Sequence, residues 1–134
     1  MNYKMITIAL LLLVITTLLI GCSSKKEAEA LQHQTITASQ AMEMMEESTD
    51  HIILDVRTKE EYDTGHIENA ILLPNEEITE KAEAMLTDKN ARILVYCRSG
   101  RRSALAAKEL VSLGYSDVID FGGINDWPYD IVYE

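Results

Sequence analysis

Short apolar runs alternate with amphipathic helical patterns through most of this chain, and this alternation limits the possible folds more than any other feature. The run Ile52–Val56 is apolar except for Asp55, as expected for a strand buried on both faces of a sheet. Strands that alternate with helices favour a parallel sheet with helices on both faces. The five expected strands are Thr35–Thr37, Ile52–Val56, Ala70–Leu73, Arg92–Tyr96 and Val118–Phe121.

Residues that start and stop helices lie between these strands. Thr37–Gln40 and Thr58–Glu61 each match a capping box, in which two side chains three residues apart accept hydrogen bonds from each other's backbone N–H groups. Asn75 is a candidate cap for a third helix, and Gly114 is expected to end a fourth. The expected helices run from Thr37 to about Glu47, from Thr58 to Gly65, from Asn75 to about Leu86, and from Arg102 to Leu113.

The N-terminal residues differ in character from the rest of the chain. Met5–Ile20 consists of apolar residues and threonine, a length typical of the hydrophobic part of a secretion signal and short for a bilayer span. An uncleaved signal anchor is the alternative. The run ends in Leu-Ile-Gly-Cys (19–22), which resembles the lipobox of bacterial lipoproteins. This resemblance implies cleavage before Cys22 and attachment of lipid to its sulfur.

These features predict three segments: a signal peptide over 1–21, a flexible tether over 22–34 and one domain over 35–134. The tether is small, polar and charged, with no sustained apolar period. We therefore expect an extracytoplasmic protein that a lipid on Cys22 anchors to a bacterial membrane without spanning it.

The charge balance excludes several classes of partner. The chain contains 12 basic and 22 acidic residues and has a net charge of −10. Loss of Lys4 with the signal peptide would make the mature chain still more acidic. Nucleic acids and anionic lipid surfaces are poor partners for such a chain. The three arginines between Cys97 and Ser103 are a local exception, and they indicate a site for an anion.

Cysteine usage points to a reactive thiol. The chain has two cysteines, so if Cys22 carries lipid then Cys97 has no partner within the chain. A single thiol in an exported protein indicates either intermolecular pairing or a reactive group. His33, His51 and His66 are scattered, and no Cys/His cluster has the spacing of metal ligands. We therefore expect neither a metal nor an organic cofactor.

Cys97 lies where an α/β sheet presents its functional groups. It is expected to be the first residue after the fourth strand, and the crevice of such a sheet lies at the carboxyl ends of its strands. A helix should begin about five residues later, and helix N-termini and clustered amides favour negative charge. A free cysteine, with a pKa of about 8.5, is only a few per cent ionised at pH 7. The amides and arginines should lower the pKa of Cys97.

Several groups of residues resemble the signatures of the rhodanese-like sulfurtransferases, in the family's order and over nearly the whole domain. They are Asp55-Val56-Arg57 with Glu61-Tyr62, Gly65–Ala70, Val95–Ser103, Leu113-Gly114-Tyr115 through Val118, and Gly122–Trp127. The resemblance implies a three-layer α/β/α domain with a five-stranded parallel sheet. It also implies a cysteine that accepts a sulfane sulfur as a persulfide and passes it to a nucleophile.

On this resemblance Cys97 is the nucleophile and persulfide carrier, within a loop that binds anions. Arg102 begins the helix and is expected to face the pocket, whereas Arg98 is expected at its rim. Ser99 and Ser103 either donate hydrogen bonds to the anion or cap the helix. The anion-binding residues expected in the loop are Arg98, Ser99, Gly100, Arg101, Arg102 and Ser103.

Three further residues are expected to support the crevice rather than to act as acid or base. The resemblance implies that Asp55 lies near the active loop and that Arg57 pairs with Glu61. His66 is interpreted as a structural histidine and Trp127 as a packing residue.

The expected function is transfer of sulfur from a small anionic donor, such as thiosulfate or polysulfide, to a thiol or cyanide acceptor by a monomeric domain. One alternative is a non-enzymatic module that carries persulfide or binds a partner. Another is a cysteine phosphatase or arsenate reductase, which needs the pattern Cys-x5-Arg. Here position 103 is serine and the spacing is Cys97-x4-Arg102, which makes a smaller ring of amides. This count favours sulfur transfer.

Overall fold

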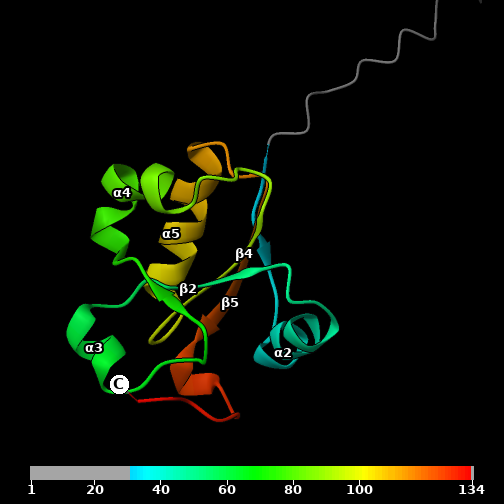
Figure 1. Cartoon of the computed structure of the whole chain (residues 1–134), viewed down its shortest axis with the longest axis vertical. Coiled ribbons are helices and arrows are strands. Elements are labelled where there is room, and N and C mark those ends of the chain that lie inside the picture. Colours follow the sequence, from blue (N-terminus) through cyan, green and yellow to red (C-terminus); the bar gives the residue numbers. More distant parts are fainter. Residues whose placement is uncertain (1–30, 134) are drawn as a thin grey trace, which may run out of the picture. The chain divides into compact units, whose positions relative to one another are not determined.

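Five parallel strands form the centre of the protein (Figure 1). The computed structural model describes residues 31–133, and in them the strands lie in the order β1-β5-β4-β2-β3. The prediction of a five-stranded parallel sheet is confirmed. The strands are β1 (Gln34–Thr35), β2 (Ile52–Asp55), β3 (Ile71–Leu72), β4 (Arg92–Cys97) and β5 (Asp117–Gly123).

Part of the predicted organisation lies outside the described residues. This applies to the signal peptide over 1–21, to lipidation of Cys22 and to the tether as far as residue 30. Within residues 31–133 no helix has both the length and the apolar character needed to cross a bilayer.

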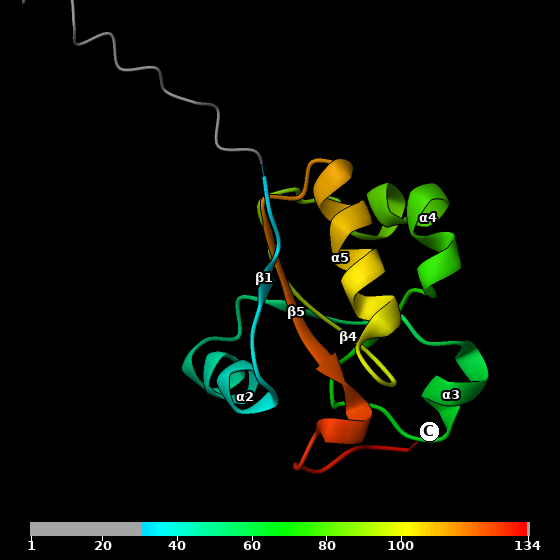
Figure 2. The same cartoon turned by 180° about the vertical axis from the view of Figure 1, so that it is seen from behind.

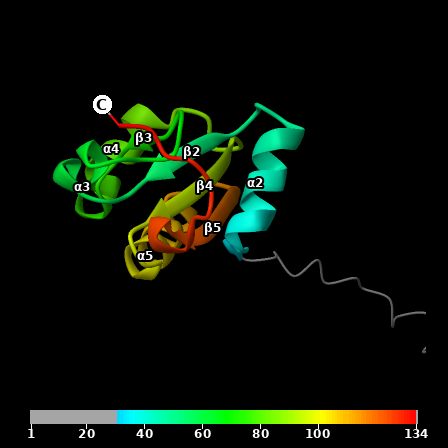
Figure 3. The ribbon, with the colours of Figure 1, turned by 90° about the horizontal axis from the view of Figure 1, so that it is seen from below.

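Helices cover both faces of the sheet (Figures 1 and 2). Helix α2 (Ala38–Glu47) packs on one face, and α4 (Ile78–Met85) and α5 (Arg101–Ser112) pack on the other, as the view from below also shows (Figure 3). Each layer buries its own apolar cluster against the sheet, so the predicted three-layer arrangement is confirmed. The shorter elements are helix α3 (Lys59–Asp63) and the 3-10 turns η1 (Asn75–Glu77) and η2 (Ile124–Asp126).

Strand β4 shows how the sheet separates the two clusters. Successive side chains of a strand point to opposite faces. Val95 and Cys97 therefore belong to the cluster beneath α4 and α5, whereas Leu94 and Tyr96 belong to the cluster beneath α2. All four side chains are at most 1% exposed.

Both predicted capping boxes are present. The Thr37 hydroxyl accepts a hydrogen bond from the Gln40 backbone N–H, and the Gln40 side chain accepts one from the Thr37 N–H. Thr58 and Glu61 do the same at the start of α3. Such boxes depend on residues three positions apart, so sequence alone locates them.

Two expectations about element ends are corrected. Asn75 does not cap a helix with its side chain; its N–H instead donates to the Val56 carbonyl at 3.1 Å, and the chain enters α4 through the turn η1. Cys97 is the last residue of β4 rather than the first residue after it, because a register shift after Val95 brings Cys97 opposite Gly123 of β5.

A buried ion pair closes the end of β2. The Arg57 guanidinium donates to both carboxylate oxygens of Asp55 at 2.6 to 3.0 Å and to the Gly65 carbonyl at 2.8 Å. Burial opposes the charge of Arg57, but the bonds to Asp55 outweigh it and raise the pKa of Arg57. The expected pairing of Arg57 with Glu61 is therefore wrong. Asp55 lies within reach because it ends the strand two residues earlier, whereas Glu61 pairs with α5.

Removal of the Arg57 charge should destabilise the fold strongly. The Arg57→Met variant leaves the Asp55 carboxylate buried without its cation, so its free energy of unfolding should fall by about 3–5 kcal/mol. The matched control is Arg92→Met, because Arg92 pairs with Asp117 at the surface. The free energy of unfolding of Arg92→Met should fall by less than about 1 kcal/mol. Urea unfolding measures the free energy of unfolding of both variants, and an equal decrease in the two would contradict the role assigned to the buried pair.

Candidate active site around Cys97

Cys97 lies at the junction of β4 and α5, where the chain turns sharply. Three residues, 98–100, separate the end of the strand from the start of the helix. Gly100 occupies the position before the helix with φ +94°, a left-handed conformation that glycine adopts at little cost. The turn lies at the end of α5 nearest α3 (Figure 2). The sequence thus folds the thiol against the first turn of a helix.

The loop contacts the end of β5 through its backbone. The Arg98 carbonyl accepts a hydrogen bond from the Asn125 N–H at 3.1 Å. At Gly123 a Cβ atom would overlap this carbonyl, so only glycine permits the approach. The Ser103 hydroxyl links the two segments further, because it donates to the carbonyls of Gly100 at 3.0 Å and Gly122 at 3.2 Å.

The paired glycines Gly122 and Gly123 help to shape the site, but the sequence pattern predicted no role for them. Their signal was present as a double glycine that immediately follows an apolar strand. The role of Gly123 can be recognised only when the register between β4 and β5 is known. Gly123 contacts the backbone of Arg98, which lies 25 residues earlier in the sequence.

The sulfur of Cys97 is hydrogen-bonded within its own loop. The Gly100 N–H donates to Sγ at 3.0 Å, and the Cys97 thiol donates to the Ser103 hydroxyl oxygen at 3.7 Å. Burial of the sulfur opposes ionisation, but the amide and hydroxyl of Ser103 and the amides of Ser99 and Gly100 outweigh it. The pKa of Cys97 is therefore lowered. Hydrogen bonds to the ionised form, rather than a neighbouring charge, produce this shift.

The two serines of the loop differ in position. Ser103 is fully buried and faces the sulfur, whereas Ser99 is exposed and contributes its backbone amide. Helix α5 has no side-chain cap. Of the two roles open to Ser103, capping of the helix is therefore excluded.

The arginines of the loop divide into two kinds. Arg102 is half-buried and binds Glu61 of α3 through two hydrogen bonds of 2.7 Å. This bonding lowers the pKa of Glu61 to about 2, and with the nearby Cys97 it raises the pKa of Arg102. Arg98 and Arg101 are exposed and make no ion pair with any residue from 31 to 133.

His66 and Trp127 occupy structural positions, as expected. The backbone of His66 pairs with Val132 in both directions at 2.8 and 2.9 Å, and its ring stacks on Tyr62 at 3.7 Å. Trp127 packs against Phe121 with ring centroids 5.6 Å apart. In the described part of the chain no group of three or more His, Cys, Asp or Glu side chains is arranged to hold a metal ion.

This arrangement can support nucleophilic chemistry at sulfur. Backbone amides and a hydroxyl converge on a thiol whose pKa they lower, and a thiolate is the nucleophilic form of cysteine. Arg98 and Arg101 belong to the same loop and are exposed, so their positive charges favour the approach of an anion.

Comparison with known proteins finds relatives over the segment that contains Cys97. The rhodanese-like domain family matches residues 37–129. Thiosulfate sulfurtransferase PspE of Escherichia coli (strain K12) is 38% identical over 73 residues, which cover 54% of this chain and 70% of PspE. Thiosulfate sulfurtransferase GlpE of Coxiella burnetii (strain RSA 331 / Henzerling II) is 33% identical over 98 residues, which cover 72% of this chain and 89% of GlpE.

The fold agrees as well. The crystal structure of a rhodanese-related protein from Thermoplasma volcanium superposes with a TM-score of 0.66 and 32% identity, covering 76% of this chain and 100% of that one. Some relatives are longer: the chain spans 20% of adenylyltransferase and sulfurtransferase UBA4 of Candida albicans. With a family match over residues 37–129 and the Cys97 loop inside it, this chain belongs to the rhodanese-like family.

Proposed function

We propose that this protein is a sulfurtransferase that carries a sulfane sulfur as a persulfide on Cys97. The observation that supports this most is the convergence of the Gly100 and Ser103 groups on Sγ, because it favours an ionised sulfur. A persulfide is also an anion, so the same donors would stabilise it.

The proposed reaction has two half-reactions. The Cys97 thiolate attacks the outer sulfur of thiosulfate; a new S–S bond forms, the old one breaks, and sulfite leaves with the bonding electron pair. A thiol or cyanide acceptor then attacks the terminal sulfur of the persulfide and takes it, which regenerates the thiolate. No net oxidation occurs, and no cofactor is required.

The arginines would serve different steps. The exposed Arg98 and Arg101 are free to attract a dianionic donor such as thiosulfate or a polysulfide. Arg102 is fixed by Glu61 close to Cys97, so its charge would stabilise the departing sulfite. Cys97 is only 1% exposed, which suits a small sulfur donor and an acceptor whose nucleophilic atom is narrow.

We also propose that the protein works outside the cytoplasm as a monomer anchored by lipid on Cys22. The support is the apolar run Met5–Ile20 followed by Leu-Ile-Gly-Cys. The polar residues 23–33 would then separate the domain from the membrane surface.

Intact mass spectrometry of the chain isolated from cells tests the proposal. After incubation with thiosulfate we expect a gain of one sulfur atom that cyanide removes and that the Cys97→Ser variant lacks. The same spectrum should show a chain that begins at Cys22 and carries lipid. A chain that retains Met1 would contradict the anchor without affecting the sulfur chemistry.

The alternatives give different results in the same assay. Sulfur uptake without catalytic turnover of thiosulfate and cyanide would indicate a persulfide carrier. Release of phosphate from an aryl phosphate, with no sulfur uptake, would indicate the phosphatase and overturn the proposal.

The Ser103 hydroxyl should control the pH dependence of the first half-reaction. The thiolate predominates above the pKa of Cys97, so the rate of sulfur uptake should fall as the pH drops through that pKa. The Ser103→Ala variant loses the hydroxyl that helps to lower the pKa of Cys97, so this pKa should rise and the fall in rate should move to higher pH. Ser112→Ala, at the far end of α5, is the control. Identical pH profiles for Ser103→Ala and the unaltered protein would contradict this role.

Arg102 should matter more to catalysis than Arg98. The Arg102→Ala variant should lose about tenfold or more in kcat/KM for thiosulfate, because a charge held beside the sulfur is removed. Arg98→Ala removes an exposed, unpaired charge, so its loss should be smaller and should shrink further at high salt. An equal decrease in kcat/KM in the two variants at every salt concentration would contradict the catalytic role assigned to Arg102.

A further inference from the structure

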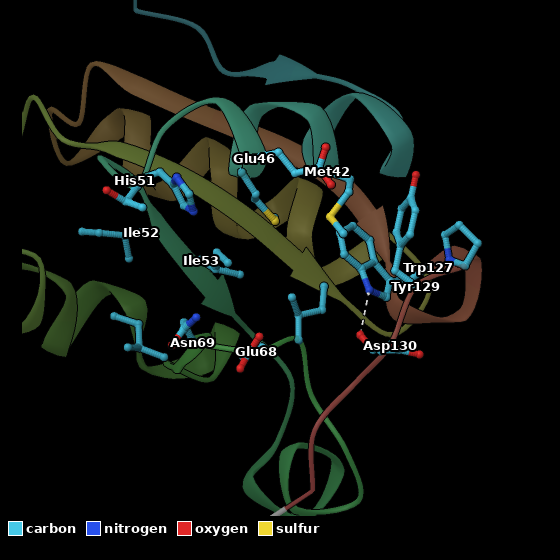
Figure 4. Close-up of a pocket in the computed structure, with 15 residues that line it drawn as sticks. Met42, Glu46, His51, Ile52, Ile53, Glu68, Asn69, Trp127, Tyr129 and Asp130 are labelled. Atoms are coloured by element: carbon cyan, nitrogen blue, oxygen red, sulfur yellow. Dashed lines mark hydrogen bonds between the residues drawn. The ribbon is translucent and has the colours of Figure 1, made fainter.

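A cavity lies on the α2 face of the sheet (Figure 4). Cys97 belongs to the apolar cluster on the other face, beneath α5. The cavity is a groove of about 900 Å³. Its walls come from the C-terminal half of α2, the start of β2, the segment 67–71 and the C-terminal segment 127–130. None of the residues assigned to sulfur transfer lines it.

The floor of the groove is apolar and partly open to solvent. Met42 of α2 lies near Trp127 (Figure 4), and Met45 also lines the groove. Tyr129 meets Trp127 edge-on with ring centroids 4.9 Å apart. Ile71 and Tyr129 are each 37% exposed. Methionine and aromatic side chains form adaptable contact surfaces for apolar groups.

The rim of the groove is acidic. Glu46 lies on the α2 side, and Glu68 and Asp130 lie on the other side (Figure 4). All three side chains are exposed, and their carboxylates make no hydrogen bond or ion pair with residues 31–133. Among residues 31–133, no lysine or arginine lines the groove. The complementary ligand therefore carries positive charge as well as apolar groups.

The carboxylates come from three separate segments of the chain. In residues 31–133 no three such side chains are arranged to hold one metal ion, whereas a peptide with several basic residues can meet all three carboxylates along the groove. Its apolar side chains would then cover Met42, Trp127 and Tyr129, and its cations could also lie over the aromatic rings.

We propose that this groove binds a basic segment of a partner protein in which lysine or arginine residues alternate with apolar ones. The segment docks on the α2 side of the sheet. The Cys97 loop and its exposed arginines remain open while it is bound. Docking through this groove is independent of the sulfur chemistry proposed above.

Trp127 allows a direct test because it is the single tryptophan of the chain and lies in the groove. Titration of the full chain with a short peptide of alternating lysine and leucine should produce a saturable change in tryptophan fluorescence. Binding should weaken with added salt, because exposed charge pairs are screened. A peptide of alternating glutamate and leucine should not bind, and neither should a lysine peptide without leucine at the same concentration.

Two triple variants that remove equal charge distinguish binding of the peptide in the groove from its non-specific attraction to an acidic protein. Glu46→Gln, Glu68→Gln and Asp130→Asn together should weaken binding by about tenfold, because three screened ion pairs are lost. The control carries Glu43→Gln, Glu47→Gln and Glu80→Gln, which remove the same charge outside the groove, and it should bind normally.

Several outcomes would overturn the proposal. Equal weakening in the two triple variants would indicate non-specific charge attraction, and fluorescence that does not change would place the peptide elsewhere. Equal affinity for a small alkylammonium ion would indicate a small-molecule site. Self-association of the chain that the groove variant abolishes would identify a second copy as the occupant. None of these outcomes alters sulfur uptake by Cys97, so the two proposals fail separately.

Discussion

The contact between the backbone of the Cys97 loop and the end of β5 is the constraint on which the candidate site depends. The register shift in β4 brings Cys97 opposite Gly123, and the absence of a side chain there lets the Arg98 carbonyl approach β5 closely. Ser103 then joins Gly100 to Gly122. Because the loop is fixed by main-chain contacts, its amides keep their direction toward the sulfur, and together with the Ser103 hydroxyl they lower the pKa of the thiol.

Two ion pairs stabilise the surroundings of this loop in different ways. Asp55 and Arg57 are almost fully buried and connect the end of β2 to Gly65, so they belong to the core of the fold. Glu61 and Arg102 are half-buried and connect α3 to the first turn of α5. The second pair orients one cation beside the sulfur and leaves the exposed arginines of the loop available to an anion.

Local features were predicted well from sequence, and long-range ones were not. The two capping boxes and the alternation of strands and helices depend on residues a few positions apart, so their signals are complete within short segments. The partner of Arg57 was predicted wrongly because Glu61 meets Arg102, 41 residues later, only in the folded protein. The role of Gly123 could not be predicted either, because it also depends on a long-range contact. The groove could not be predicted because its walls come from four segments that are distant in the sequence. The strand pattern placed Cys97 at the carboxyl end of β4 and the resemblance implied its role, whereas the hydrogen bonds to its sulfur required coordinates.

The separation of the two apolar clusters by the sheet has a consequence for how such a protein can diversify. Neighbouring residues of β4, such as Tyr96 and Cys97, face different compartments, so substitutions in one compartment leave the packing of the other largely intact. A lineage could therefore exchange the residues of α2 and the C-terminal segment to suit a new binding partner and inherit the thiol chemistry unaltered. The architecture permits recognition and reactivity to evolve at different rates within about a hundred residues.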